Sequence, residues 1–188
     1  MTTRINYDHE LTLLNDDIKQ MGYMVESSIE QCFIAFEDQD FEKAEGIIRG
    51  DRTINDLERS IEARCLSLIL RQQPVAGDLR VVSSALKVVT DLERIGDHAS
   101  DIAELILRIR GEHIYHVVRH IPGMAMAARE MVRSAIDAFI SQDITAAKTI
   151  EKQDDIVDEL FTKVKNDVID LLKQSAEHAD QCIDLLMI

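Results

Sequence analysis

The chain has 188 residues and a formal net charge of −14, with 46% apolar, 30% charged and only 4% aromatic residues. This length suits one sizeable domain or two small ones, and the low counts of glycine (7) and proline (2) favour long helices over sheets. The acidic balance argues against direct binding of nucleic acid, whose phosphates require lysine and arginine, and suits metal cations, basic partner proteins or simple solubility.

The first part of the chain is predicted to form three long helices. Apolar residues that recur at steps of three and four predict helices over residues 7–37, 41–72 and 75–110. A short polar break at residues 38–40 separates the first two helices. Pro74 separates the second from the third, because proline starts a helix well but cannot continue one, and Gly111 is a good helix stop.

The second part repeats this pattern after an irregular stretch at residues 112–121. Three further helices are predicted, over about 122–140, over 144–175, and from 177 to the last residue. A shift of 103 residues places the second helix on the fifth, so that Phe36 matches Phe139 and Asp51 matches Asp154. We therefore predict an all-α protein of two tandem three-helix bundles, residues 1–111 and 112–188. Its six long helices are antiparallel, and the last is incomplete at Ile188.

The third helix carries the most distinctive stretch, residues 90–99, with the sequence TDLERIGDHA. Glu93 and Asp97 are four residues apart, so both carboxylates project from one side of the helix and repel each other unless something positive lies between them. The second and third helices should form an antiparallel hairpin around Pro74, in which positions equally far from the turn face each other. Asp51 and Asp97 lie 23 residues from Pro74, and Asn55 and Glu93 lie 19 residues from it.

Four oxygen-bearing side chains are therefore expected to meet on the outside of the first bundle. Oxygen ligands with open positions favour Mg²⁺, Mn²⁺ or iron over zinc. The second unit keeps half of this arrangement, as Asp154 and Asp158. Solvation of a plain acidic face, or pairing with Arg52 or Arg94, would explain the same residues without a metal.

Other acidic and ionisable residues are interpreted more simply. Glu58 and Glu62 lie on the same flank but are left out of the site, because their repeat counterparts are Phe161 and Lys165. The three isolated cysteines are interpreted as small buried groups in a reducing compartment. Four of the six histidines could be ligands but are interpreted as surface residues: His98, His113, His116 and His120.

The sequence contains no nucleophile–base arrangement, phosphate-cradling glycine loop or Glu-x-x-His pair. It also contains no apolar run of 18 residues and no apolar core of a signal peptide near Met1, so a soluble cytoplasmic protein is expected.

The stretch RQQPVAGDLR at residues 71–80, followed by Leu86-Lys87 and by DLERIGDH at residues 91–98, resembles the PhoU family of accessory and regulatory proteins of phosphate-specific transport. The resemblance spans the whole chain, including the acidic stretch at residues 154–158. It implies two three-helix bundles, a cytoplasmic and often homodimeric protein, and no catalytic activity.

The resemblance also implies partners and metals. Members of the family are thought to bridge the ATPase of the phosphate ABC transporter and the phosphate sensor histidine kinase, so that contact with the membrane is only through partners. They repress the phosphate-starvation response when phosphate is plentiful. Some bind metal ions, Mg, Mn, Fe or Zn, through motifs that match Glu93 and Asp97 here, with Asp51, Asn55, Asp154 and Asp158 on the facing helices. Asn55 departs from an all-carboxylate site.

Two other function classes compete with the adaptor interpretation. One is a metal-dependent phosphatase or oxidase built on the same acidic residues, and the other is a purely structural helical bundle that binds no metal.

Overall fold

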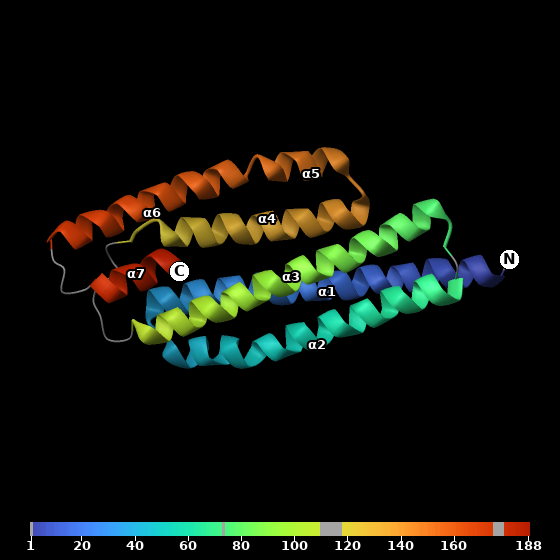
Figure 1. The fold of residues 1–188 in the computed structure, drawn as a ribbon, viewed down its shortest axis with the longest axis horizontal. Helices are drawn as coiled ribbons and strands as arrows, with labels where there is room; N and C mark the ends of the chain where they lie inside the picture. The colour runs from blue at the N-terminus through green and yellow to red at the C-terminus, as the bar shows by residue number, and fades with distance from the viewer. Residues whose placement is uncertain (1, 73, 110–117, 175–178) are drawn as a thin grey trace.

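The computed structural model describes residues 2–72, 74–109, 118–174 and 179–188, and every regular element within them is a helix (Figure 1). The helices are α1 (Thr2–Asp38), α2 (Phe41–Gln72), α3 (Ala76–Arg108), α4 (Ile121–Ser141), α5 (Ile144–Glu151), α6 (Asp154–Gln174) and α7 (Ala179–Met187). Helices α1, α2 and α3 form one antiparallel bundle, and α4 to α7 form a second bundle alongside it. The predicted all-α fold of two tandem bundles is confirmed.

The first bundle is built from three apolar stripes that face one another. Leu14 and Ile18 of α1, Ile61 of α2, and Val82 and Val89 of α3 are almost completely buried in one core cluster. Burial of a side chain of this size contributes about 1.5–3 kcal/mol. The long α2–α3 pair is therefore held rigidly along its length.

The second bundle docks on the first through α4, which lies against α1. A Cβ at Gly22 of α1 would collide with the Ile136 side chain of α4, so this glycine permits the close approach of the two helices. Arg129 of α4 also pairs with Glu30 of α1 at 2.6 Å. One apolar core cluster contains residues of α1, α3, α4, α6 and α7, so the core is continuous across the bundles.

The tandem repeat is visible in the backbone of two equivalent turns. Gln39 and Gln142, 103 residues apart, are the two non-glycine residues with positive φ among those described, at 54° and 55°. Next to them, the N–H of Asp40 donates to Ala35 O at 3.0 Å, and the N–H of Asp143 donates to Ala138 O at 2.9 Å. Such bonds satisfy carbonyls at a helix end, and their recurrence confirms the repeat.

The prediction of one continuous helix over residues 144–175 was wrong, because the structure has a break between α5 and α6. The N–H groups of Lys152 and Gln153 donate to Thr149 O and Ile150 O, which are i→i−3 bonds of a turn. The acidic Asp154 and Asp155 then occupy the first turn of α6, where the helix dipole favours negative charge. The boundary predicted between residues 111 and 112 lies outside the described residues.

Candidate metal centre

The register of the α2–α3 hairpin is the one predicted from Pro74. A Cβ on Gly96 would lie 3.1 Å from Cδ1 of Ile54, so the two helices nearly touch at that level. Further toward the turn, the Thr90 side chain of α3 lies near Glu58 of α2, where it opposes the rise that burial causes in the pKa of the Glu58 carboxyl. Both contacts join positions at nearly equal distances from Pro74; the first lies within the predicted meeting point, and the second lies between that point and the turn.

Carboxylates from the two helices interact along this seam. We call Asp51 and Glu58 of α2 with Glu93 and Asp97 of α3 the acidic cluster. Burial raises the pKa of Asp51, and the negative charge of Asp97 raises it further. Burial likewise raises the pKa of Glu93, and the negative charges of Asp97 and Asp51 raise it further. The three carboxylates that were predicted to meet are therefore electrostatically coupled.

Asp51 and Asn55 present oxygens that lack partners. The Asn55 Nδ2 group donates to Oδ2 of Asp51 at 3.0 Å, which orients both side chains on one face of α2. Oδ1 of Asp51 and Oδ1 of Asn55 are nevertheless buried without a hydrogen-bond partner. A buried acceptor left unsatisfied costs about 1–3 kcal/mol, so these two oxygens favour a ligand that accepts their lone pairs, as a cation does.

No ion pair among the described residues includes Asp51, Glu93 or Asp97. Basic side chains therefore do not supply the positive charge at these carboxylates through direct pairing. Arg94 approaches Asp91 at 4.0 Å, and Lys87 pairs with the same carboxylate at 3.3 Å. The positive charge of Arg94 opposes the rise in the pKa of Glu93 caused by burial and by the neighbouring carboxylates. The sequence left open that these carboxylates pair directly with arginine instead of binding a metal. The geometry disfavours that explanation.

These residues suit a metal ion in the chemistry of their donor atoms and in the orientation of Asp51 and Asn55. The donors are carboxylate and amide oxygens, which suit hard cations. Across the described ranges, however, no three carboxylate, imidazole or thiol groups lie close enough together to share one ion. Side-chain rotation would have to bring Glu93 and Asp97 toward the oriented pair of Asp51 and Asn55.

The other predicted ligands are not brought together. Asp154 and Asp158 are exposed at the beginning of α6 and belong to no such group within the described part of the chain. His98 is exposed next to Asp101, with Nδ1 at 3.8 Å from Oδ2, and His120 lies 3.9 Å from Asp167. Both are surface residues as predicted, whereas His113 and His116 lie outside the described residues.

Sequence reasoning missed Glu58. Burial raises the pKa of its carboxyl, and the charges of Glu93 and Glu62 raise it further, so Glu58 extends the acidic cluster toward the turn. The hairpin arithmetic could have found this residue, because Glu58 and Thr90 are equally far from Pro74. It was discarded because its repeat counterpart is not acidic.

Comparison with known proteins gives a consistent result. A family model described as "PhoU domain" matches residues 18–106 and 121–188. A protein of Clostridium acetobutylicum named phosphate-specific transport system accessory protein PhoU homolog is 36% identical over 187 residues, which are 99% of this chain and 85% of that protein. A protein of the same name from Aquifex aeolicus is 34% identical over 94% of this chain and 80% of its own.

Solved structures show the same fold. The crystal structure of PhoU from Pseudomonas aeruginosa superposes with a TM-score of 0.88 and 28% identity, covering 96% of this chain and 87% of that chain. The phosphate transport system regulatory protein PhoU from Streptococcus pneumoniae superposes with a TM-score of 0.87 at 27% identity.

Proposed function

The chain belongs to the PhoU family, and from this we propose that it is a regulatory adaptor of phosphate uptake. It represses the phosphate-starvation response when phosphate is plentiful and modulates the phosphate ABC transporter. Two relatives are named as accessory proteins of the phosphate-specific transport system, which supports a role at that transporter. The partners we propose are the transporter's ATPase and the phosphate sensor histidine kinase, with the adaptor acting as a homodimer in the cytoplasm.

Contact with the membrane would be made through these partners. None of the described helices has both the length and the apolar character needed to cross a lipid bilayer. The rigid hairpin of α2 and α3 offers a long, charged outer surface for protein contacts, and the net charge of −14 favours basic partner surfaces.

The observation that carries the metal-binding part of the proposal is the pair of buried, unpartnered oxygens on Asp51 and Asn55. These face a hairpin arm that carries Glu93 and Asp97. We propose that these four residues hold Mg²⁺, Mn²⁺ or iron, with zinc less suited to an all-oxygen donor set. A bound cation supplies positive charge that offsets the repulsion between the carboxylates. Asp154 and Asp158 are proposed as half of an equivalent set in the second unit.

Elemental analysis of purified protein tests the metal centre. We expect metal in the wild-type protein and much less in the double variant Glu93→Ala/Asp97→Ala. The variant Asp91→Ala is the control, because Asp91 is an exposed carboxylate of the same helix that pairs with Lys87 and Arg94. Equal metal content in all three proteins would remove the site from the proposal.

The adaptor role is tested separately by a pull-down from membranes of phosphate-replete cells. We expect the tagged protein to capture the transporter's ATPase and the sensor kinase, and absence of both would argue against the adaptor. Turnover of generic phosphoesters in the presence of Mn²⁺, abolished by Asp97→Ala, would instead establish a metal-dependent phosphatase.

A further inference from the structure

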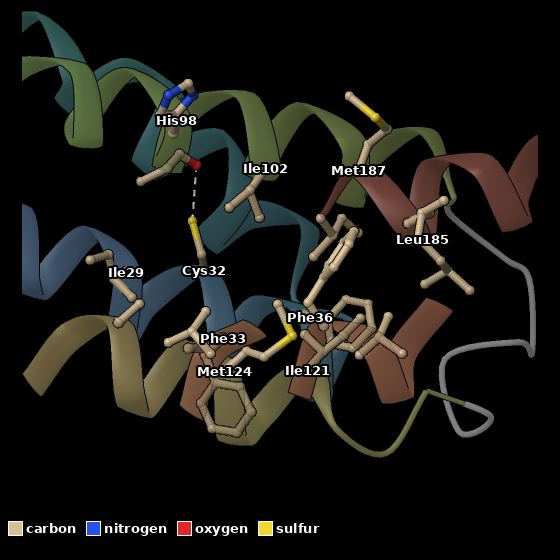
Figure 2. Close-up of a pocket in the computed structure, with 18 of the residues that line it drawn as sticks. Ile29, Cys32, Phe33, Phe36, His98, Ile102, Ile121, Met124, Leu185 and Met187 are labelled. Carbon is tan, nitrogen blue, oxygen red and sulfur yellow. Dashed lines mark hydrogen bonds between the residues drawn. The ribbon is translucent and has the colours of Figure 1, made fainter. Parts of the chain in front are cut away.

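Apolar side chains are exposed around the turn of the α2–α3 hairpin. This turn lies at the end of the molecule opposite to α7 (Figure 1). The exposed apolar residues there, which we call the tip patch, are Leu66 (54% exposed), Leu70 (78%), Val75 (68%) and Leu79 (41%). The apolar cavity where the bundles meet is a separate surface, because its lining comes from α1, α3, α4, α6 and α7 and belongs to the packing of the bundles (Figure 2).

The tip patch continues the two rows of side chains that carry the acidic cluster. On α2, Leu66 and Leu70 follow Glu62 at steps of four residues, so the three lie on one flank of the helix. On α3, Leu79 precedes Glu93 by two steps of seven residues, which also places both on one side. The seam between the two helices therefore changes from acidic to apolar on its way to the turn.

This seam faces away from the second bundle. Val81 and Ser84 of α3 line a groove that α3 shares with α4 and α5. Leu79 is two residues from Val81, about 200° around the helix axis, so it lies on the other side of α3. The tip patch is thus an exposed apolar surface of the first bundle alone, and exposed apolar patches of this kind mark interaction sites.

The acidic half of the seam has no basic partner in ion-pair geometry within the described part of the chain. Glu58 experiences the negative charges of Glu93 and Glu62, and none of these three carboxylates belongs to an ion pair between described residues. Arg94 approaches Asp91 instead, at 4.0 Å. A molecule that lies along the seam therefore gains from positive charge at one end and from apolar side chains at the other.

The extent and the surroundings of the tip patch decide between possible occupants. At the observed exposures the four side chains offer roughly 150–300 Å² of apolar surface, whereas a stable dimer needs about 800 Å² from each copy. A cytoplasmic membrane surface is negative and would repel the acidic rows of a chain with a net charge of −14. A helix of a partner protein, in contrast, needs only a few apolar anchors at steps of three and four residues.

We infer that the α2–α3 seam docks one amphipathic helix of a partner protein. The apolar residues of that helix lie on the tip patch, and its lysine or arginine residues lie beside Glu58, Glu62 and Glu93. Leu70 and Glu58 are twelve residues apart on α2, about 18 Å, which a helix of about 16 residues covers. The inference rests on the proposed adaptor function, because it supplies the surface through which the adaptor holds a partner.

A fluorescein-labelled synthetic peptide of about 16 residues serves as the probe. Its first half carries leucines at steps of three and four, and its second half carries lysines. In fluorescence anisotropy with EDTA, we expect saturable binding to the wild type and at least tenfold weaker binding to Leu66→Ser/Leu70→Ser. Met126→Ser, exposed on α4, is the control and should bind as the wild type does. Equal affinity of the leucine variant and the wild type would overturn the inference, because charge attraction alone would then explain the binding.

Charge reversal tests the position of the positive end. A second peptide, with glutamates in place of the lysines, should bind the wild type at least tenfold more weakly than the first. Glu62→Lys should weaken binding of the lysine peptide and strengthen binding of the glutamate peptide. Equal binding of both peptides to the wild type, or an unchanged preference in Glu62→Lys, would refute the inference.

Two further measurements separate a partner helix from other occupants and from the adaptor function itself. Circular dichroism verifies that Leu66→Ser/Leu70→Ser is folded, and Leu70→Ser alone replaces it if it is not. Pelleting with vesicles of phosphatidylglycerol and phosphatidylethanolamine, or a dimer in sedimentation, would overturn the inference if the leucine variant abolished either.

In the pull-down from membranes, the leucine variant should capture at least tenfold less of one partner than the wild type does. Equal capture by the variant and the wild type would refute this surface and leave the adaptor function standing.

Discussion

The variant Asp51→Asn should make the metal-free protein more stable while making the metal-loaded protein less stable than wild type. In the folded chain the Asp51 carboxylate is partly buried and is repelled by Asp97. An asparagine amide has the same shape, removes that repulsion, and can donate a hydrogen bond to the unpartnered Oδ1 of Asn55. Removal of a like-charge contact contributes a few tenths of a kcal/mol and the new hydrogen bond about 1 kcal/mol.

These contributions give an increase of about 1 kcal/mol in the metal-free unfolding free energy, or roughly 2–4 °C in Tm for a chain of this size. Manganese acts in the opposite direction. At a concentration 100 times its Kd, a ligand that binds only the folded state adds about 2.7 kcal/mol, which corresponds to about 5–10 °C. Loss of one carboxylate ligand should remove most of that gain, so the order of the two proteins reverses when Mn²⁺ is added.

Thermal unfolding followed by circular dichroism, with EDTA or with Mn²⁺, measures both effects. The control is Asp91→Asn, which carries the same charge change on an exposed residue that pairs with Lys87 and Arg94. It should lower stability by less than about 1 kcal/mol and leave the Mn²⁺ shift intact. A lower metal-free Tm for Asp51→Asn, or an undiminished Mn²⁺ shift, would refute the argument that Asp51 is a strained carboxylate placed for a cation.

Three further predictions concern the same seam and the docking of α7. Because the carboxyl pKa values of Asp51, Glu58 and Glu93 are raised in the folded state, that state binds more protons than the unfolded state as pH falls. When the pH is lowered from neutral through these pKa values, the three groups should therefore raise the unfolding free energy of the metal-free protein. Urea unfolding at a series of pH values, with EDTA present, measures this effect. Gly96→Ala places a Cβ 3.1 Å from Ile54 Cδ1 and should weaken Mn²⁺ binding by separating α2 from α3, whereas Gly46→Ala, in open space, should add up to about 1 kcal/mol without changing affinity in Mn²⁺ titrations. Arg108→Met leaves the buried Asp184 carboxylate without the partner at 3.0 Å and should cost about 1–3 kcal/mol, with faster hydrogen exchange confined to α7.

The hairpin register could be derived from the sequence because it depends on few quantities. Pro74 marks the turn, an uninterrupted helix rises by a fixed amount per residue, and equal offsets must then face each other. The contact of Gly96 with Ile54 and the proximity of Thr90 to Glu58 follow from this arithmetic. The helix bounds 41–72 were likewise predictable, since a polar break and a proline delimit them.

Other features depend on packing that periodicity does not reveal. The sequence of residues 144–175 has the pattern of one helix, yet α5 packs chiefly against α4 and has no buried residue, so nothing holds it in line with α6. Glu58 belongs to the acidic cluster because Glu93 lies near it across the hairpin. Its counterpart in the repeat is not acidic and therefore gave no indication of this. The apolar cavity is formed by five helices from both bundles, which no local pattern specifies.

The difference between α2 and its repeat counterpart makes the first unit better suited than the second to the metal site that we propose. Asp51 and Asn55 lie in the middle of an unbroken helix that α1 and α3 contact along its length, so their direction is fixed relative to α3. Asp154 and Asp158 lie just after a backbone break, on a helix whose neighbours are α4 and the short α7. A multidentate oxygen site needs its ligands held within a fraction of an ångström of the productive geometry. Packing on both sides of α2 fixes the backbone of the first unit, so that only the side chains of Glu93 and Asp97 would have to move, whereas the same two residue positions in the second unit lack that support.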